Sequence, residues 1–188
     1  MSVLHEQVIY FETKVGDNTA EVALQYNDSY NELLLSFANN IHTTDGGTHE
    51  QGFKTAMTRA FNEFGRAKGY IKDKEANLTG NSVRAGMTAG ISVTLSEAQF
   101  EGQTKARLGN TELRGIVDNL VSGKLTEFCE EHPAVTKAID DKARTAARAR
   151  EAATKTGVGV SRNTGGQHNR QPAEPADRSS LSPGTTTR

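Results

Sequence analysis

A stripe of apolar side chains at helical spacing constrains the fold of this chain more than any other feature. Within residues 48–64 the apolar positions recur three or four residues apart: Phe53, Ala56, Met57, Ala60, Phe61 and Phe64. A helix with one such face must bury it against another layer of structure. We therefore predict a helix that covers a β-sheet, with its three phenylalanines in the core.

The start of this helix is indicated by its first residues. Thr48 and Gln51 have the spacing of a capping box, directly after the Asp45-Gly46-Gly47 turn. His49 lies beside this predicted cap. Helix N-termini attract anions, yet a lone histidine there is more often a surface residue or an indirect donor, and we interpret His49 in that way.

Strand patterns precede and follow this helix. Residues 7–13 alternate, a Gly16-Asp17-Asn18 turn follows, and residues 20–26 resume the pattern, which together predict a hairpin. Residues 33–37 are a short continuous apolar run, which we interpret as a central strand buried on both faces. Residues 87–95 alternate again, and the predicted core face of that strand holds Met87, Ala89, Ile91, Val93 and Leu95.

Further helices are predicted in the second half of the chain. Residues 81–84 have the pattern of a single helical turn. An apolar stripe between Leu113 and Phe128 marks a long helix that ends before Pro133, and Pro133 suits the first position of the next helix. That last helix, at about 133–155, has a narrow alanine-rich stripe and many basic residues.

Composition narrows the functional classes. The 188 residues suit one domain, or one domain plus a tail, and the net charge of -1 does not indicate a chain that binds nucleic acid through its overall charge. The single cysteine, Cys129, cannot form an internal disulfide, and we predict a packed thiol in a reducing, cytoplasmic location. No apolar run has the length of a membrane span. We therefore expect no membrane contact. No Cys or His pair has metal-ligand spacing, so we also expect no metal site.

The candidate binding residues lie in a polar loop at residues 100–110. The glycine at Gly102 permits a positive φ and a close approach of the backbone to a ligand. Gln103, Thr104 and Lys105 offer an amide, a hydroxyl and an ammonium within three residues, a donor set that suits a terminal phosphate. Such a triplet on its own is also compatible with a solvated loop that binds nothing.

Several motifs follow one another along the chain: Tyr26-Asn27-Asp28-Ser29-Tyr30, Phe37-Ala38-Asn39-Asn40-Ile41, Asp45-Gly46-Gly47-Thr48-His49, Phe100-Glu101-Gly102-Gln103-Thr104-Lys105 and Ala147-Arg148-Ala149-Arg150-Glu151-Ala152-Ala153. Their order and spacing resemble those of the second, transducer domain of the bacterial DNA gyrase B family. The E subunit of topoisomerase IV is similar to almost the same degree. The resemblance covers most of the chain.

The resemblance implies an α+β fold in which helices cover one face of a mixed β-sheet, with the left-handed β-α-β crossover of the ribosomal-protein-like transducer domain of GHKL ATPases. Residues 1–155 would be a transducer domain from an ATP-dependent type II DNA topoisomerase, either gyrase, which supercoils DNA negatively, or topoisomerase IV, which decatenates it. Lys105 would reach the terminal phosphate of ATP as the catalytic residue, beside Gln103 and Thr104. The rest of the ATP site and its Mg²⁺ would lie in other parts of the subunit, so the fragment alone is expected to be inactive.

The partners implied by the resemblance are the A subunit of gyrase, a second copy of the B subunit and double-stranded DNA. The family helix that corresponds to residues 133–155 lies near a DNA cavity, so Arg144, Arg148 and Arg150 are implied to contact DNA phosphates. A solvated charged face is the alternative. A competing class of function is a non-catalytic nucleic-acid-binding module that uses this helix.

The composition changes from residue 156 onwards. Residues 156–188 are rich in Gly, Ser, Thr and Pro and poor in large apolar side chains, so we predict a disordered tail. This tail departs from the family, whose helix continues with more basic residues. A frame error, an incomplete gene fragment or an added tail would each account for the departure.

Overall fold

A single mixed β-sheet forms the centre of the structure, which is a computed structural model that describes residues 2–162, with side chains as far as Lys155. Within the described residues, five strands lie in the order β1-β2-β5-β3-β4. Their bounds are Ile9–Val15 for β1, Asn18–Tyr26 for β2, Leu33–Ala38 for β3, Ile41–His42 for β4 and Met87–Thr94 for β5. Neighbouring strands are antiparallel except β3 and β5, which run parallel.

The predicted hairpin is confirmed. Strands β1 and β2 pair from Ile9 opposite Leu24 to Val15 opposite Asn18, so the connection is the two residues between them. Gly16 has a φ of 62° in this turn. Glycine adopts such a φ without the steric cost that a Cβ would add.

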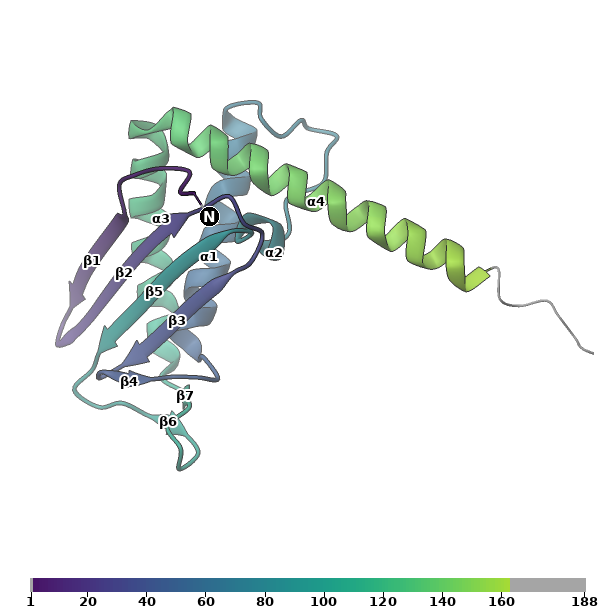
Figure 1. Cartoon of the computed structure of the whole chain (residues 1–188). Coiled ribbons are helices and arrows are strands. Elements are labelled where there is room, and N and C mark those ends of the chain that lie inside the picture. Colours follow the sequence, from purple (N-terminus) through teal and green to yellow (C-terminus); the bar gives the residue numbers. More distant parts are fainter. Residues whose placement is uncertain (1, 163–188) are drawn as a thin grey trace, which may run out of the picture. The chain divides into compact units, whose positions relative to one another are not determined.

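Four helices accompany the sheet in the described part of the chain: α1 at Thr48–Ala67, α2 at Gly80–Val83, α3 at Thr111–Glu131 and α4 at Pro133–Arg162. Figure 1 shows α1 and α3 on one side of the sheet, behind the strands. The whole predicted stripe of α1 is buried, from Phe53 to Phe64, and so is the predicted face of β5, from Met87 to Val93. The prediction of an α+β fold with a mixed sheet and packed helices is confirmed.

The chain divides into a compact unit that ends at Ala152 and a second unit that begins at Ala153. In the second unit α4 continues as far as Arg162. The predicted tail at 156–188 falls mostly on residues 163–188, which lie outside the described residues. The boundary at residue 155 and the disorder of the tail therefore stay predictions.

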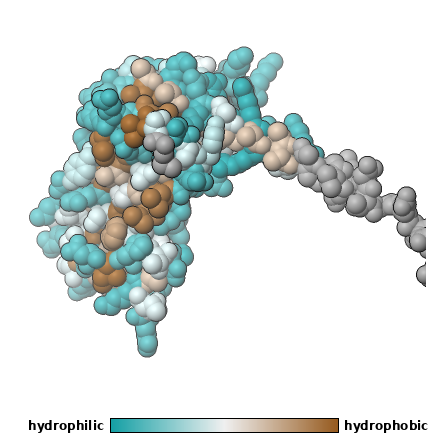
Figure 2. All heavy atoms as spheres, viewed as in Figure 1, coloured by the Kyte–Doolittle hydropathy of each residue, from teal (hydrophilic) through white to brown (hydrophobic). Residues whose placement is uncertain are grey.

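The interpretation of residues 33–37 as a central strand buried on both faces is wrong. Strand β3 lies next to the two-residue β4 near one edge of the sheet, and Leu33 and Leu35 are 51% and 40% exposed. Successive side chains of a strand point to opposite faces, and in the described part of the chain α1 and α3 lie on one face of this sheet. Figure 2, viewed onto the other face, shows apolar atoms across the strands. Ser36, in contrast, faces the buried side.

No helix in the described part of the chain is both long and apolar enough to cross a membrane. The same residues contain no group of His, Cys, Asp or Glu side chains that could hold a metal ion.

The packed thiol predicted at Cys129 is confirmed, because its side chain lies in the core between α3 and the sheet.

Burial raises the pKa of the Cys129 thiol to about 11. The thiolate is the nucleophile, so we expect alkylation of the folded protein by iodoacetamide at pH 8 to be slowed by more than about 100-fold relative to the unfolded chain. Mass spectrometry against time, with and without denaturant, measures this ratio. Equal rates would show that the α3 face is open to solvent.

Candidate functional site

The predicted ligands Gln103, Thr104 and Lys105 lie together at the tip of a small hairpin between β5 and α3. Its strands are β6 at Phe100–Glu101 and β7 at Arg107–Leu108, which pair antiparallel. All three tip residues are exposed. The hairpin therefore presents an amide, a hydroxyl and an ammonium to solvent at one place, where a ligand held by another body could meet them.

Two residues of the tip have a positive φ, a backbone conformation that favours glycine. Gly102 has a φ of 80° and Lys105 a φ of 53°. A positive φ is uncommon for a residue other than glycine. The Lys105 Nζ lies 5.9 Å from the centre of the Phe100 ring, and Arg107 pairs with Glu101 at 2.9 Å across the two strands. The backbone turn thus places the Lys105 ammonium over the hairpin rather than away from it.

The base of the hairpin is closed by Asn110, a buried residue that the sequence analysis missed. The Gln99 N–H donates to Asn110 Oδ1 at 2.7 Å, and Asn110 Nδ2 donates to the Glu97 carbonyl at 3.1 Å. The Gly109 N–H also donates to the Gln99 carbonyl at 2.7 Å. These bonds join the outgoing and returning arms of the loop, so the base is fixed while the tip stays open.

The returning arm rests on the Asp45-Gly46-Gly47 turn. The Asp45 N–H donates to the Ala106 carbonyl at 2.8 Å, and the Leu108 N–H donates to the Gly46 carbonyl at 3.1 Å. Gly47 has a φ of 144°, and a Cβ on it would lie 2.5 Å from the Leu108 carbonyl oxygen. Only glycine fits this conformation and this approach. The turn therefore supports the returning arm of the loop.

The predicted capping box at Thr48 and Gln51 is wrong. Helix α1 has Gly47 as its N-cap and no side-chain cap bond. Thr48 Oγ1 instead donates to the carbonyl of Asn110 at 2.6 Å. A threonine hydroxyl has one proton to donate, and here it ties the first residue of α1 to the base of the loop.

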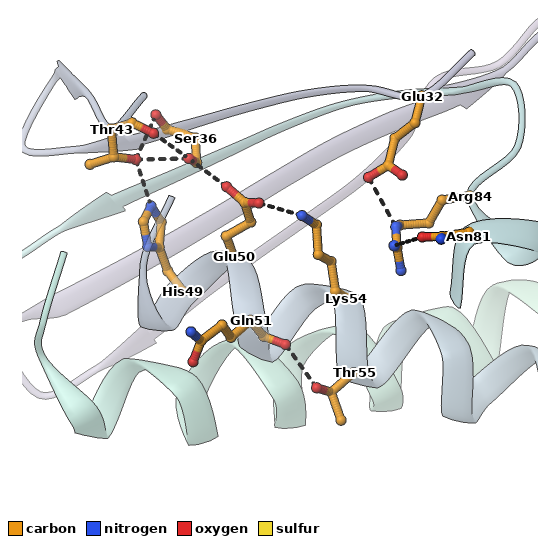
Figure 3. Close-up of polar contacts among 10 residues, drawn as sticks. All are labelled: Glu32, Ser36, Thr43, His49, Glu50, Gln51, Lys54, Thr55, Asn81 and Arg84. Atoms are coloured by element: carbon orange, nitrogen blue, oxygen red, sulfur yellow. Dashed lines mark hydrogen bonds and ion pairs between the residues drawn. The ribbon is translucent and has the colours of Figure 1, made fainter. Parts of the chain in front are cut away.

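His49 lies in the core rather than at the surface, so that interpretation is corrected too. Its Nε2 lies 3.2 Å from Thr43 Oγ1, which itself donates to the Ser36 carbonyl at 2.9 Å (Figure 3). Because the Thr43 proton is used for Ser36, we assign the imidazole proton to Nε2, as donor to Thr43. His49 Nδ1 then has no hydrogen-bond partner among the described residues. This buried network joins α1 to β3.

The three arginines predicted to contact DNA have different surroundings. Arg144 donates to the Tyr70 carbonyl at 2.9 Å and pairs with Asp140 at 3.1 Å, so it holds α4 to the segment after α1. Arg150 donates to Ser82 Oγ at 3.0 Å. The side chain of Arg148 is exposed. Their contact with DNA stays a prediction.

The chain matches the DNA gyrase B family model over residues 1–158. The B subunit of DNA gyrase from Clostridium acetobutylicum is 53% identical over 154 residues, which are 81% of this chain and 24% of the relative. The B subunit from Streptococcus pneumoniae serotype 4 is 45% identical over 184 residues, 98% of this chain and 28% of the relative. The chain therefore spans about a quarter of the length of these curated relatives.

Solved structures of gyrase B and of topoisomerase IV are similar to this chain. The 43K ATPase domain of Thermus thermophilus gyrase B, in complex with an aminocoumarin, aligns with a TM-score of 0.76 and 38% identity over 82% of this chain and 42% of that one. The topoisomerase IV ATP-binding domain of Francisella tularensis aligns with a TM-score of 0.70 and 26% identity, over 78% of this chain and 41% of that one.

The buried His49 predicts a specific loss of stability in acid. Burial lowers the pKa of His49 from 6.5 to about 4, partly opposed by Glu50. The unfolded chain therefore takes up a proton on His49 as the pH falls below 6.5, while the folded chain does not until about pH 4. Stability is lost over this interval, by about 3 kcal/mol between pH 7 and pH 4.

We expect a His49→Gln variant, whose side chain keeps a donor for Thr43, to lose about 3 kcal/mol less of its unfolding free energy than the wild type over that range. Urea unfolding at a series of pH values measures the difference. The exposed His42, replaced in His42→Gln, is the matched control and should keep the wild-type dependence. An identical acid dependence in all three proteins would contradict the assignment.

Proposed function

The chain belongs to the DNA gyrase B family, and from this we propose that it is the transducer part of the ATPase region of the B subunit of a type II DNA topoisomerase. In this proposal the Gln103-Thr104-Lys105 tip contacts the terminal phosphate of an ATP molecule held by another part of the subunit. The activity, ATP-driven negative supercoiling of DNA, belongs to the whole assembly, and the 188-residue chain alone is inactive.

The observation that carries the proposal is the contrast between the open tip and the fixed base of the loop. Three donors are exposed on a hairpin whose two arms are joined by Asn110 and seated on the Asp45-Gly46-Gly47 turn. Donors that are positioned before the ligand arrives stabilise developing charge without the cost of reorganisation. Lys105 is the residue to which we assign catalysis, with Gln103 and Thr104 as further phosphate ligands.

The donor set fits a phosphate and does not fit a metal ion. A lysine ammonium and an amide N–H bind phosphate oxygens, whereas Mg²⁺ prefers oxygen ligands such as carboxylates. The described residues hold no cluster of metal-binding side chains. We therefore propose that the Mg²⁺ that accompanies ATP is bound by parts of the subunit outside this chain.

The same contacts would make the loop a switch. The tip can hold the terminal phosphate only while that phosphate is attached, so its affinity differs between the ATP and ADP states. A ligand shifts a conformational equilibrium by its differential affinity for the states. We propose that the loop reports hydrolysis in this way and that the movement reaches DNA through the rest of the domain.

We assign the chain to gyrase rather than to topoisomerase IV. The assignment rests on the curated relatives named as gyrase B subunits, which are 43% to 53% identical to this chain. Among the solved structures, gyrase B of Myxococcus xanthus and the topoisomerase IV domain are each 26% identical to it. The proposed partners are accordingly the A subunit of gyrase, a second B subunit and double-stranded DNA, in the bacterial cytoplasm. Topoisomerase IV remains the alternative.

Three finer features belong to this proposal. The connection from β3 through α1 to β5 is proposed to be left-handed, supported by the parallel pairing of β3 with β5 and by the position of α1 behind them in Figure 1. The domain is proposed to occupy residues 1–155, and Arg144, Arg148 and Arg150 of α4 are proposed to contact DNA phosphates. Of these, Arg148 and Arg150 are both exposed, and Arg150 also donates to Ser82 Oγ.

Lys105→Ala in a full-length subunit that carries this sequence should lower the steady-state rate of ATP hydrolysis by roughly 100-fold, because an electrostatic donor to the transition state is removed. Affinity for a non-hydrolysable ATP analogue should fall much less, and affinity for ADP should not change, since ADP lacks the contacted phosphate.

The matched control is Lys124→Ala, which removes an exposed lysine of α3 that pairs with Glu127. This variant should hydrolyse ATP at the wild-type rate. Small and equal losses in both variants would mean that the loop is solvated surface and that the proposed function is wrong.

A further inference from the structure

We propose that Thr48 and Asn110 form a clamp that positions the Gln-Thr-Lys loop and fixes its base to the first turn of α1. The inference rests on the proposed function of the loop and names the residues through which the loop acts on the domain. We call this pair the loop clamp.

The first half of the loop clamp is the side chain of Asn110. This residue is the N-cap of α3, where an asparagine ordinarily accepts a hydrogen bond from a backbone N–H of its own helix. Here no such cap bond is present. The side chain bonds instead to Gln99 and Glu97, on the outgoing arm of the loop, and its Nδ2 also donates to the Glu112 side chain in the first turn of α3 at 2.9 Å. Asn110 thus makes no side-chain cap bond to the backbone of α3 and joins the arms of the loop instead.

The second half of the loop clamp is the hydroxyl of Thr48. It donates to the Asn110 carbonyl at 2.6 Å, so the residue that joins the two arms is itself bonded to the first residue of α1. The buried side chain of Leu108 and its N–H bond to Gly46 hold the neighbouring part of the returning arm. All of these contacts lie at residues 106–110, and none involves the tip.

The packing next to the loop clamp makes α1 and α3 move together. A Cβ on Gly52 would collide with the carbonyl oxygen of Arg114, so the backbones of the two helices touch near their N-terminal ends. Close-packed interfaces transmit small shifts instead of absorbing them. A displacement of the loop base should therefore act on α1.

At its other end α1 meets α4. A Cβ on Gly65 would lie 3.2 Å from Asp140 Oδ1 of α4, and Asp140 pairs with Arg144. Helix α1 spans 20 residues, or about 30 Å. It consequently connects the loop clamp to the N-terminal half of α4. In this proposal a displacement of the tip is transmitted to α1 through the loop clamp.

The test uses Thr48→Val, which keeps the shape of the side chain and removes the hydroxyl, and Thr48→Ser, which restores the hydroxyl. The control is Thr55→Val, which removes a hydroxyl from the same helix that donates only to the Gln51 carbonyl (Figure 3). Amide hydrogen exchange is measured by NMR in the 188-residue chain.

We expect Thr48→Val to speed exchange at Leu108 and Gly109 by roughly tenfold, because the Asn110 carbonyl loses the shorter of its two hydrogen bonds and keeps only the Leu113 N–H at 3.3 Å. Amides of β2 and β5 should exchange at wild-type rates, and Thr48→Ser and Thr55→Val should resemble the wild type throughout. Unchanged exchange at Leu108 and Gly109, or an equal rise over the whole sheet, would overturn the loop clamp.

A second arm places the same variants in the full-length subunit. Thr48→Val should lower kcat for ATP hydrolysis by roughly tenfold with little change in KM, since the tip is misplaced only where it meets the transition state. In a Lys105→Ala background the same change should have almost no further effect on kcat. Additive losses in the double variant would overturn the positioning role.

The two proposals fail differently. If Lys105→Ala has no effect on hydrolysis while Thr48→Val still loosens Leu108 and Gly109, the phosphate-binding function is wrong and the structural clamp stands. If Lys105→Ala abolishes hydrolysis while Thr48→Val changes neither exchange nor kcat, the loop clamp is wrong and the function of the tip stands.

Discussion

The close contact between α1 and α3 at Gly52 and Arg114 is the interaction on which the rest of the structure depends. One of these helices follows the Asp45-Gly46-Gly47 turn and the other follows the Gln-Thr-Lys loop. Bringing the helices together therefore also brings the turn and the loop together. Both helices then cover a single face of the sheet, where the alternating side chains of β1, β2 and β5 complete the core.

For the phosphate-responsive loop that we propose, this arrangement separates two demands. The tip has to be open, so that a nucleotide held by another body can reach it, and the base has to be rigid, so that contact with the nucleotide has a mechanical effect. In this chain the tip residues are exposed, while Leu108 and Asn110 a few residues later are buried. The change from solvent to core occurs within the returning arm of one short hairpin.

The elements with local periodicity could be predicted from the sequence, and those that depend on distant partners could not. The stripe of α1 and the alternation of β5 have the periods of their own backbones, and both predictions are confirmed. The apolar run at residues 33–37 has no period, so its exposed face was missed. Thr48 has the spacing of a capping box, but its partner is the carbonyl of Asn110, 62 residues away. The burial of His49 depends likewise on Thr43 and Ser36, whose positions the fold determines. The proposed phosphate role of the tip comes from the family resemblance and not from the three side chains alone.

The way the loop closes also determines where its length can vary. Every bond that anchors it involves residues 97–99 or 106–110, so insertions between Gly102 and Lys105 would leave the anchoring intact. An insertion between Ala106 and Asn110 would shift Leu108 out of register with Gly46 and out of the core. Each added pair of residues, one in each arm, would extend the hairpin by about 3.4 Å. The length of the hairpin can thus change without a change in the hydrogen bonds at its base. Related subunits could have hairpins of different length on the same base.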